Sequence, residues 1–172
     1  MRKVSEPMEE KNVKEVALSL GSNVGDSYQT LLSSLKDLSR FVDDMKVSSF
    51  YRTDPMDMKY QPDFINLAVA GKTSISPDAL LKKVNSVEKK YGRARAIKYG
   101  PRTLDIDIIL FGSEIVKRDD LVIPHPEFRK RLFVIEPLAE IAPEMKDPVD
   151  GKEVHEILKE ARAHFSDRIE KL

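Results

Sequence analysis

The sequence predicts an α+β fold on the ferredoxin-like, split βαβ plan: helices packed on an antiparallel sheet, with an extra C-terminal hairpin and helix. Three observations support this prediction. Segments of strand length recur along the chain, two amphipathic helical patterns separate them in the order β-α-β-β-α-β, and a length of 172 residues suits one domain. We expect residues 1–12 to form a flexible tail and residues 13–172 to form a single domain.

A change of period predicts the first strand and the first helix. Apolar residues alternate from Val16 to Leu20, as in a half-buried strand, and the stretch 21–26 with its two glycines ends the alternation. From Tyr28 to Val42 apolar residues recur at helical spacing, and Asp26 or Ser27 is able to cap this helix.

The middle of the chain is predicted as strand, loop and strand. Residues 46–52 are rich in β-formers, which indicates one strand. Residues 53–63 contain Asp-Pro and Gln-Pro and form a loop of about ten residues. Residues 64–70 are strongly apolar and predict a second, more deeply buried strand.

The second helix has a clear start at Ser76-Pro77-Asp78, which combines a capping serine, a proline at the first helical position and an acid in the first turn. Gly92 can end it in the left-handed conformation. A basic loop over 92–102 then leads to a strand over 103–111. We expect 114–116 and 121–123 to pair as a hairpin and a final helix to run over 153–163.

The composition excludes several classes of protein. The 29 basic residues balance the 29 acidic ones, which argues against adhesion to nucleic acid or anionic lipid. Without cysteine there is no disulfide framework, thiolate nucleophile or Cys-ligated metal. No signal-peptide core and no apolar run of about 18–20 residues is present. We therefore expect a cytoplasmic protein without membrane or nucleic-acid partners.

Two carboxylates on the predicted strand 103–111 form the first candidate site. Asp105 and Asp107 point to one face and Ile106 to the other, because side chains alternate along a strand. The carboxylates start about 6–7 Å apart, which suits one divalent ion or a pair of ions. Oxygen donors without a His or Cys in the same strand favour Mg²⁺. The alternative is a solvent-facing strand edge.

Four cations precede this pair within ten residues, with no acid among them: Arg93, Arg95, Lys98 and Arg102. A cation-rich loop beside an acidic metal pair has the parts needed to handle a polyphosphate. The alternative is a solvated surface loop. The metal and phosphate interpretations support each other, because each supplies the countercharge that the other lacks.

Other features each admit two interpretations. His125 lies between two prolines that fix its backbone, as a surface residue of a rigid turn or as a ligand contact. The run Arg129–Arg131 is an exposed face or a set of phosphate partners. Asn66 interrupts an apolar strand and either makes a structural hydrogen bond or binds a flat heterocycle. The stretch Gly21–Gly25 turns the chain or binds an anion.

Motifs along the chain together resemble one enzyme family. They are Leu20-Gly21-Ser22-Asn23, Ser49-Phe50-Tyr51-Arg52-Thr53 with Pro55, Gln61-Pro62-Asp63-Phe64-Ile65-Asn66, Gly100-Pro101-Arg102-Thr103-Leu104-Asp105-Ile106-Asp107, Pro124-His125-Pro126, and the run 137–143. Most specifically through the run 100–107, the chain resembles the 6-hydroxymethyl-7,8-dihydropterin pyrophosphokinases of folate biosynthesis, over about residues 16–158.

The resemblance implies transfer of the β,γ-diphosphate of ATP to the hydroxymethyl group of the reduced pterin, with release of AMP and with two Mg²⁺ ions. It implies that Asp105 and Asp107 hold the metal and that Arg93 and Arg102 contact the diphosphate as catalytic residues. The implied ATP-binding positions are Glu88, Arg95, Lys98, Ile108, His125 and Arg131. The implied pterin-binding positions are Gly21, Thr53, Met56, Phe64, Asn66 and Phe133.

The chain departs from the family pattern at Lys98-Tyr99, where many relatives carry Arg-Trp, and this change affects the loop contacts. Two rival classes stand beside the transferase: a ferredoxin-like module that binds RNA or a small ligand, and a metal-dependent phosphohydrolase. Against the first, the two carboxylates would repel RNA phosphates unless metal is bound. The sequence identifies no general base. No unexplained apolar stripe suggests an obligate interface, so we expect a monomer.

Overall fold

The computed structural model describes residues 12–55, 60–92 and 103–172. Its main sheet has the strand order β5-β1-β4-β3-β8, with β2 also pairing with β4, and its pairs are antiparallel. A separate pair, β6 and β7, forms a small hairpin. The strands are β1 (Lys14–Ser22), β2 (Asp43–Val47), β3 (Tyr51–Thr53), β4 (Phe64–Thr73), β5 (Asp105–Phe111), β6 (Val116–Lys117), β7 (Val122–Ile123) and β8 (Ile169–Lys171).

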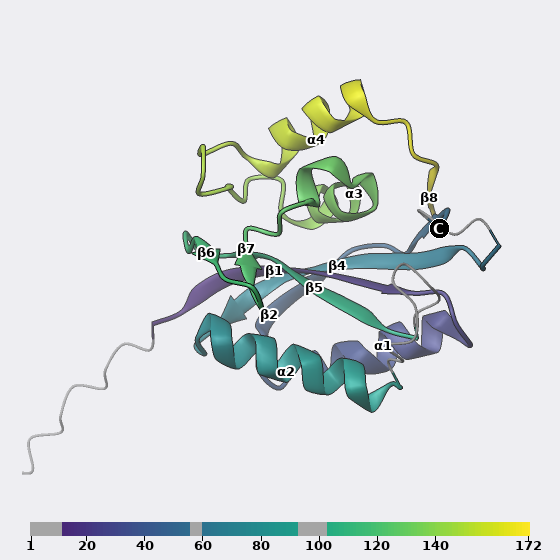
Figure 1. Ribbon diagram of the computed structural model, residues 1–172, viewed down its shortest axis with the longest axis horizontal. Coiled ribbons are helices and arrows are strands. Elements are labelled where there is room, and N and C mark those ends of the chain that lie inside the picture. The colour runs from purple at the N-terminus through teal and green to yellow at the C-terminus, as the bar shows by residue number, and fades with distance from the viewer. Residues whose placement is uncertain (1–11, 56–59, 93–102) are drawn as a thin grey trace, which may run out of the picture.

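Helices cover both faces of this sheet (Figure 1). Helices α1 (Ser27–Leu38) and α2 (Pro77–Lys90) lie on one face, and α3 (Leu132–Ile141) and α4 (Val154–His164) lie on the other. A short 3-10 helix, η1 (Phe128–Lys130), precedes α3. The predicted α+β, ferredoxin-like fold with an antiparallel sheet is therefore confirmed, and so is the hairpin before the C-terminal helices.

Each face of the sheet has its own apolar core. Leu18, Leu31 and Leu80 belong to the cluster between the sheet and helices α1 and α2. Ala68 and Ile135 belong to the cluster between the sheet and helices α3 and α4. Burying one leucine side chain contributes roughly 1.5–3 kcal/mol. The two clusters therefore fix the sheet from both sides and hold its strand register.

Both predicted helix starts are confirmed. The side chain of Asp26 accepts a hydrogen bond from the backbone N–H of Gln29 at 3.1 Å, and Ser76 does the same for Ala79 at 3.1 Å. The predicted helix over residues 28–42 is shorter than expected, since α1 ends at Leu38. Gly92 has a φ of +74°, as a glycine that ends a helix should.

The prediction of one strand over residues 46–52 is wrong. The segment forms the end of β2 and most of β3, separated at Ser48, whose hydroxyl accepts the backbone N–H of Ala68 at 2.8 Å. Helix α3 and strand β8 were not predicted at all. Pro137 lies inside α3, and proline is normally a helix-breaking signal. Most of the predicted tail, residues 1–11, lies outside the described residues.

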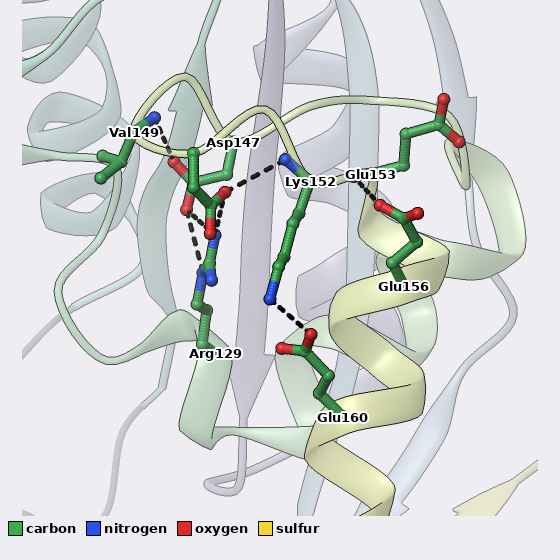
Figure 2. Close-up of polar contacts among 8 residues, drawn as sticks. Arg129, Asp147, Val149, Lys152, Glu153, Glu156 and Glu160 are labelled. Carbon is green, nitrogen blue, oxygen red and sulfur yellow. Dashed lines mark hydrogen bonds and ion pairs between the residues drawn. The ribbon is translucent and has the colours of Figure 1, made fainter.

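A polar cluster holds the connection between α3 and α4 in place. The Arg129 guanidinium donates to the buried carboxylate of Asp147 at 2.7 and 3.0 Å (Figure 2), and it also donates to Asp150 at 2.6 Å. Glu153 and Glu156 then form a capping box at the start of α4. The described helices include no segment long and apolar enough to cross a membrane.

Candidate active site

One row of residues across the sheet contains three of the predicted site positions. Gly21 on β1 is registered opposite Asn66 on β4 and opposite Asp105 on β5. Partners in an antiparallel sheet point to the same face. This is the face on which α3 and α4 pack, because Ala17 and Ala68 point the same way and lie in their core. The register thus brings together residues that are distant in the sequence.

Gly21 is in tight contact with the side chain of Asn66. A Cβ atom at position 21 would lie 2.6 Å from Oδ1 of Asn66 and 3.7 Å from the ring of Phe64. A real Cβ does not approach another atom so closely, so any larger residue at position 21 would force the Asn66 side chain to move. The motif glycine is therefore explained by close packing against Asn66, and it lies within β1 instead of ending it.

Asn66 also joins β4 to β3. Its Nδ2 donates to Oγ1 of Thr53 at 2.7 Å, and both side chains are buried. Thr53 is registered opposite Phe64, so Phe64, Asn66 and Thr53 lie on one face. These residues and Gly21 place an aromatic ring beside an amide and a hydroxyl. Such a surface suits a flat heterocycle with its own donors and acceptors.

Asn23 belongs to one of the family motifs but was not predicted as a site residue. It connects two segments next to Gly21 and Phe64. Its Nδ2 donates to Oε1 of Gln61 at 2.9 Å and to the carbonyl of Pro62 at 3.0 Å. The segment after β1 is thereby tied to the segment before β4. The sequence signal for this role was a polar amide beside a glycine at the end of an apolar strand.

The two carboxylates lie on the same face of β5. Asp105 and Asp107 are partly exposed, while Ile106 between them is buried in the opposite core, so the predicted alternation is confirmed. Asp105 is registered opposite Gly21, which is itself opposite Asn66 on the next strand. The described residues include no group of three or more His, Cys, Asp or Glu side chains arranged to hold a metal. Two oxygen donors suit Mg²⁺, which usually keeps waters and takes substrate phosphates as its other ligands.

His125 faces the second carboxylate. Its Nε2 lies 4.0 Å from Oδ2 of Asp107, and its Nδ1 accepts the backbone N–H of Glu127 at 3.2 Å. Burial, together with the positive charge of Arg131, lowers the pKa of His125 to about 4, against the opposing effect of Asp105 and Glu127. The ring is therefore neutral at pH 7, and its accepting Nδ1 leaves the proton on Nε2, toward Asp107.

A cleft of about 290 Å³ runs along the outer edge of β5. Among the described residues, β5 is the last strand of the main sheet, so no strand pairs with its outer edge. Glu88 on α2 is buried, and its carboxylate accepts the N–H of Ile106 at 3.2 Å. Because backbone groups alternate in direction along a strand, Ile108 presents its N–H and C=O toward the same edge. The lining residues include Glu88, Asp107, Ile108, His125 and the segment 119–122.

The beginning of α3 supplies two more of the predicted positions. Arg131 precedes the helix, and its guanidinium carbon lies 5.7 Å from the centroid of the Phe133 ring. Phe133 packs on the core between the sheet and α3, on the same side of the sheet as Phe64. Arg129, by contrast, forms ion pairs with Asp147 and Asp150, and Lys130 lies 3.8 Å from a carboxylate oxygen of Glu127.

The remaining predicted positions lie outside the described residues. They are Met56 and the basic residues Arg93, Arg95, Lys98 and Arg102. The described site therefore has three parts, joined by the register of β5, β1 and β4: the two carboxylates, the edge cleft, and an amide surface formed by Gly21, Thr53, Phe64 and Asn66.

A family model described as 7,8-dihydro-6-hydroxymethylpterin-pyrophosphokinase (HPPK) matches residues 17–143. Two curated proteins named 2-amino-4-hydroxy-6-hydroxymethyldihydropteridine pyrophosphokinase are similar to the chain. The Aquifex aeolicus protein is 39% identical over 141 residues, covering 82% of this chain and 88% of its own. The Bacillus subtilis protein is 41% identical over 138 residues, covering 79% of this chain and 83% of its own.

Solved structures share the fold. The wild-type HPPK-DHPS protein of Plasmodium falciparum matches with a TM-score of 0.66 and 15% sequence identity, over 86% of this chain. The match spans 44% of that longer protein. At this level of identity the likeness concerns the fold alone.

Proposed function

The chain belongs to the 7,8-dihydro-6-hydroxymethylpterin-pyrophosphokinase family, and we propose that its amide surface forms a pocket for the pterin while its edge cleft takes the nucleotide. The chain is an ATP-dependent diphosphotransferase of folate biosynthesis. It transfers diphosphate from ATP to the hydroxymethyl group of 6-hydroxymethyl-7,8-dihydropterin and releases AMP. The observation that carries this proposal is the row Asn66–Gly21–Asp105, which runs from the amide surface to the carboxylates beside the cleft.

The pterin lies on the amide surface. Asn66 and Thr53 hydrogen-bond its polar edge, and the bare backbone of Gly21 forms a wall that admits a flat ring. Phe64 and Phe133 stack on its two faces, since both rings lie on the same side of the sheet. Met56 completes the pocket. This assignment follows the family motif residue by residue and agrees with the buried amide–hydroxyl pair.

The nucleotide lies along the edge cleft. The backbone of Ile108 bonds the adenine edge, and His125 and Arg131 contact the rest of the nucleotide, with the neutral His125 donating from Nε2. Glu88 contributes by holding the N–H of Ile106 and so the line of the strand edge. Arg95 and Lys98 complete the ATP contacts, and Arg93 and Arg102 neutralise the diphosphate that is transferred.

Asp105 and Asp107 hold Mg²⁺, with two ions expected. A metal held by these two carboxylates would supply positive charge beside the phosphate oxygens and would lower the pKa of a nearby hydroxyl. The pterin hydroxyl oxygen forms a bond to the β-phosphorus as the bond from that phosphorus to the α,β-bridging oxygen breaks. AMP leaves with the bridging oxygen, and the hydroxyl proton passes to solvent. The protein residues position the two substrates in line and neutralise charge, and no covalent enzyme intermediate is required.

The test is a product analysis. The protein is incubated with ATP, Mg²⁺ and the reduced pterin, and AMP is resolved from ADP and phosphate. We expect AMP and the pterin diphosphate in equal amounts, and only when the pterin is present. Formation of ADP or free phosphate would favour the phosphohydrolase, and ATP binding without turnover would favour the binding module.

A further inference from the structure

A cation near the C-terminus lies across both ends of the segment that joins β3 to β4. One nitrogen of the Arg168 guanidinium is 2.7 Å from Oδ1 of Asp54 and 2.8 Å from Oδ2 of Asp63. Asp54 directly follows Thr53, and Asp63 directly precedes Phe64. Arg168 therefore connects the backbone positions next to two residues of the proposed pterin pocket.

Strand register explains why these three charges meet. Strand β8 pairs with β3 at the end of the sheet (Figure 1), with Ile169 opposite Thr53. Strand β3 pairs with β4, with Thr53 opposite Phe64. Residues 169, 53 and 64 thus form one row across three strands. Residues 168, 54 and 63 stand one position beyond that row, where the strands end.

The arrangement joins two like charges through one opposite charge. Two carboxylates that contact the same guanidinium nitrogen would repel each other if that nitrogen were removed. The repulsion would act at the ends of β3 and β4, beside the hydrogen bond from Asn66 to Thr53. All three side chains are partly exposed, at 58% for Arg168, 55% for Asp54 and 38% for Asp63, so water screens the interaction and its effect is moderate.

We propose that Arg168 is a positioning residue for the pterin pocket: it holds the ends of β3 and β4 together and so keeps Thr53 and Phe64 in binding geometry. This inference rests on the proposed function. Arg168 lies C-terminal to the stretch that the family model matches, residues 17–143, so the contact comes from a part of the chain outside the shared pattern. Arg168 acts on the pterin alone, through its neighbours, and leaves the edge cleft for ATP unchanged.

The experiment measures KM separately for the two substrates in Arg168→Ala, Arg168→Gln and Arg168→Lys. We expect Ala and Gln to raise KM for the pterin about 3- to 10-fold, the scale of two partly exposed ion pairs, with KM for ATP and kcat little changed. Lys keeps the charge and restores most of the affinity. Raising the ionic strength should raise the pterin KM of the wild type toward that of Arg168→Ala and should change the variant less.

A matched control comes from Glu170 on strand β8, two residues after Arg168. Glu170→Gln removes the ion pair between Glu170 and Arg52, whose atoms lie 3.5 Å apart, without touching Asp54 or Asp63. We expect its pterin KM to equal that of the wild type. In a protein that carries both Asp54→Asn and Asp63→Asn, adding Arg168→Ala should have no further effect on KM, because the charges that it bridges are gone.

Two failures are distinguishable. If the wild type forms no pterin-dependent AMP, the proposed function is wrong and this inference is wrong with it. If the wild type turns over normally while Arg168→Ala and Arg168→Gln keep the wild-type KM for the pterin, only this inference is overturned. A lower melting temperature in both variants with unchanged KM would likewise overturn it, because it would show a purely structural role.

Discussion

At Gly21, one added methyl group would collide with the side chain at the centre of the proposed pterin pocket. The Cβ of Gly21→Ala would lie 2.6 Å from Oδ1 of Asn66, so the amide must move and its hydrogen bond to Thr53 must weaken. Forced overpacking of this kind typically costs about 1–3 kcal/mol. We expect KM for the pterin to rise roughly 10- to 100-fold, with KM for ATP nearly unchanged, in steady-state kinetics with each substrate varied.

Gly71→Ala provides the matched control. Its Cβ would lie 2.6 Å from Cγ1 of Val42 and 2.7 Å from the carbonyl oxygen of Asp43. Gly71 lies in β4, the strand that also carries Asn66, but away from the proposed pterin pocket. This variant should lose stability without changing the KM of either substrate. Equal changes of pterin KM in both variants would mean that the effect of Gly21→Ala is a general loss of packing.

Replacing Asp107 should affect the reaction without affecting the fold. Asp107→Ala should lower kcat roughly a thousandfold or more, because in the proposed mechanism charge neutralisation at the transferred phosphates depends on a metal held by Asp107. The fold should survive, since the Asp107 side chain is 31% exposed and its loss leaves Asp105 with one less like charge nearby. Turnover and circular dichroism of the purified variant check both parts. Unimpaired turnover would contradict the metal assignment.

For single residues, the sequence predicts on which face of a strand a side chain lies, but not which residues of neighbouring strands lie opposite it. The alternation around Ile106 was enough to place Asp105 and Asp107 on one face. That Gly21 stands between Asn66 and Asp105 depends on how three strands are registered, and register is fixed by packing of the whole sheet. The amide–hydroxyl pair of Asn66 and Thr53 follows from the same register.

Among the elements, the capped helices were predictable and α3 was not. Asp26 and Ser76 cap the starts of α1 and α2 through local hydrogen bonds that do not depend on tertiary contacts, so both starts could be predicted from the sequence. Helix α3 contains Pro137, and tertiary packing stabilises it in place of local signals. Its residues Val134, Ile135 and Leu138 are buried against the sheet and α4. Burial of that kind outweighs propensity, and it cannot be read from ten residues of sequence.

A buried carboxylate ties α1 to α2, and its stabilising effect should depend on pH. Asp37 accepts hydrogen bonds from Lys90 at 2.8 Å and from Tyr91 at 2.7 Å. These bonds, that of Lys90 first, hold the pKa of Asp37 below its ordinary value. The stabilisation is therefore fully present above the unfolded-state pKa, near 4, and is lost as pH falls through the lower folded-state pKa.

Asp37→Asn should accordingly lower the free energy of unfolding by about 1–2 kcal/mol at pH 7, and the difference from the wild type should shrink as pH falls below about 4. Urea unfolding at a series of pH values measures it. Asp43→Asn, at an exposed carboxylate on β2, is the control and should change little at any pH. A wild-type-to-variant difference that stays constant down to the lowest pH would contradict the assignment.

For the whole molecule, the sequence predicted the two helices of the β-α-β-β-α-β pattern and one further C-terminal helix, and the structure has two helices on each face of the sheet. The pattern β-α-β-β-α-β accounts for the sheet and for α1 and α2. The second layer, α3 and α4, covers the face that carries Asp105, Gly21 and Asn66, and brings Arg131 and Phe133 to that side of the sheet. The candidate site therefore depends on a layer that local sequence patterns did not reveal in full.

The charge of the whole molecule leads to a last prediction about its two substrates. A net charge of zero provides no general attraction for ATP, and the carboxylates of Asp105 and Asp107 repel phosphates unless a metal lies between them. ATP binding should therefore require Mg²⁺. A non-hydrolysable ATP analogue at about 100 times its dissociation constant should raise the melting temperature by roughly 5–10 °C with Mg²⁺ present.

Chelation with EDTA should remove most of that shift, although the analogue is still there. In the double variant Asp105→Asn, Asp107→Asn the repulsion and the metal ligands disappear together, so the shift caused by the analogue should become independent of Mg²⁺. Differential scanning fluorimetry of both proteins, with and without EDTA, measures this directly and requires no turnover. An equal shift in the wild type with and without Mg²⁺ would mean that basic side chains of the protein hold the triphosphate without metal, and the metal site would have to be reassigned.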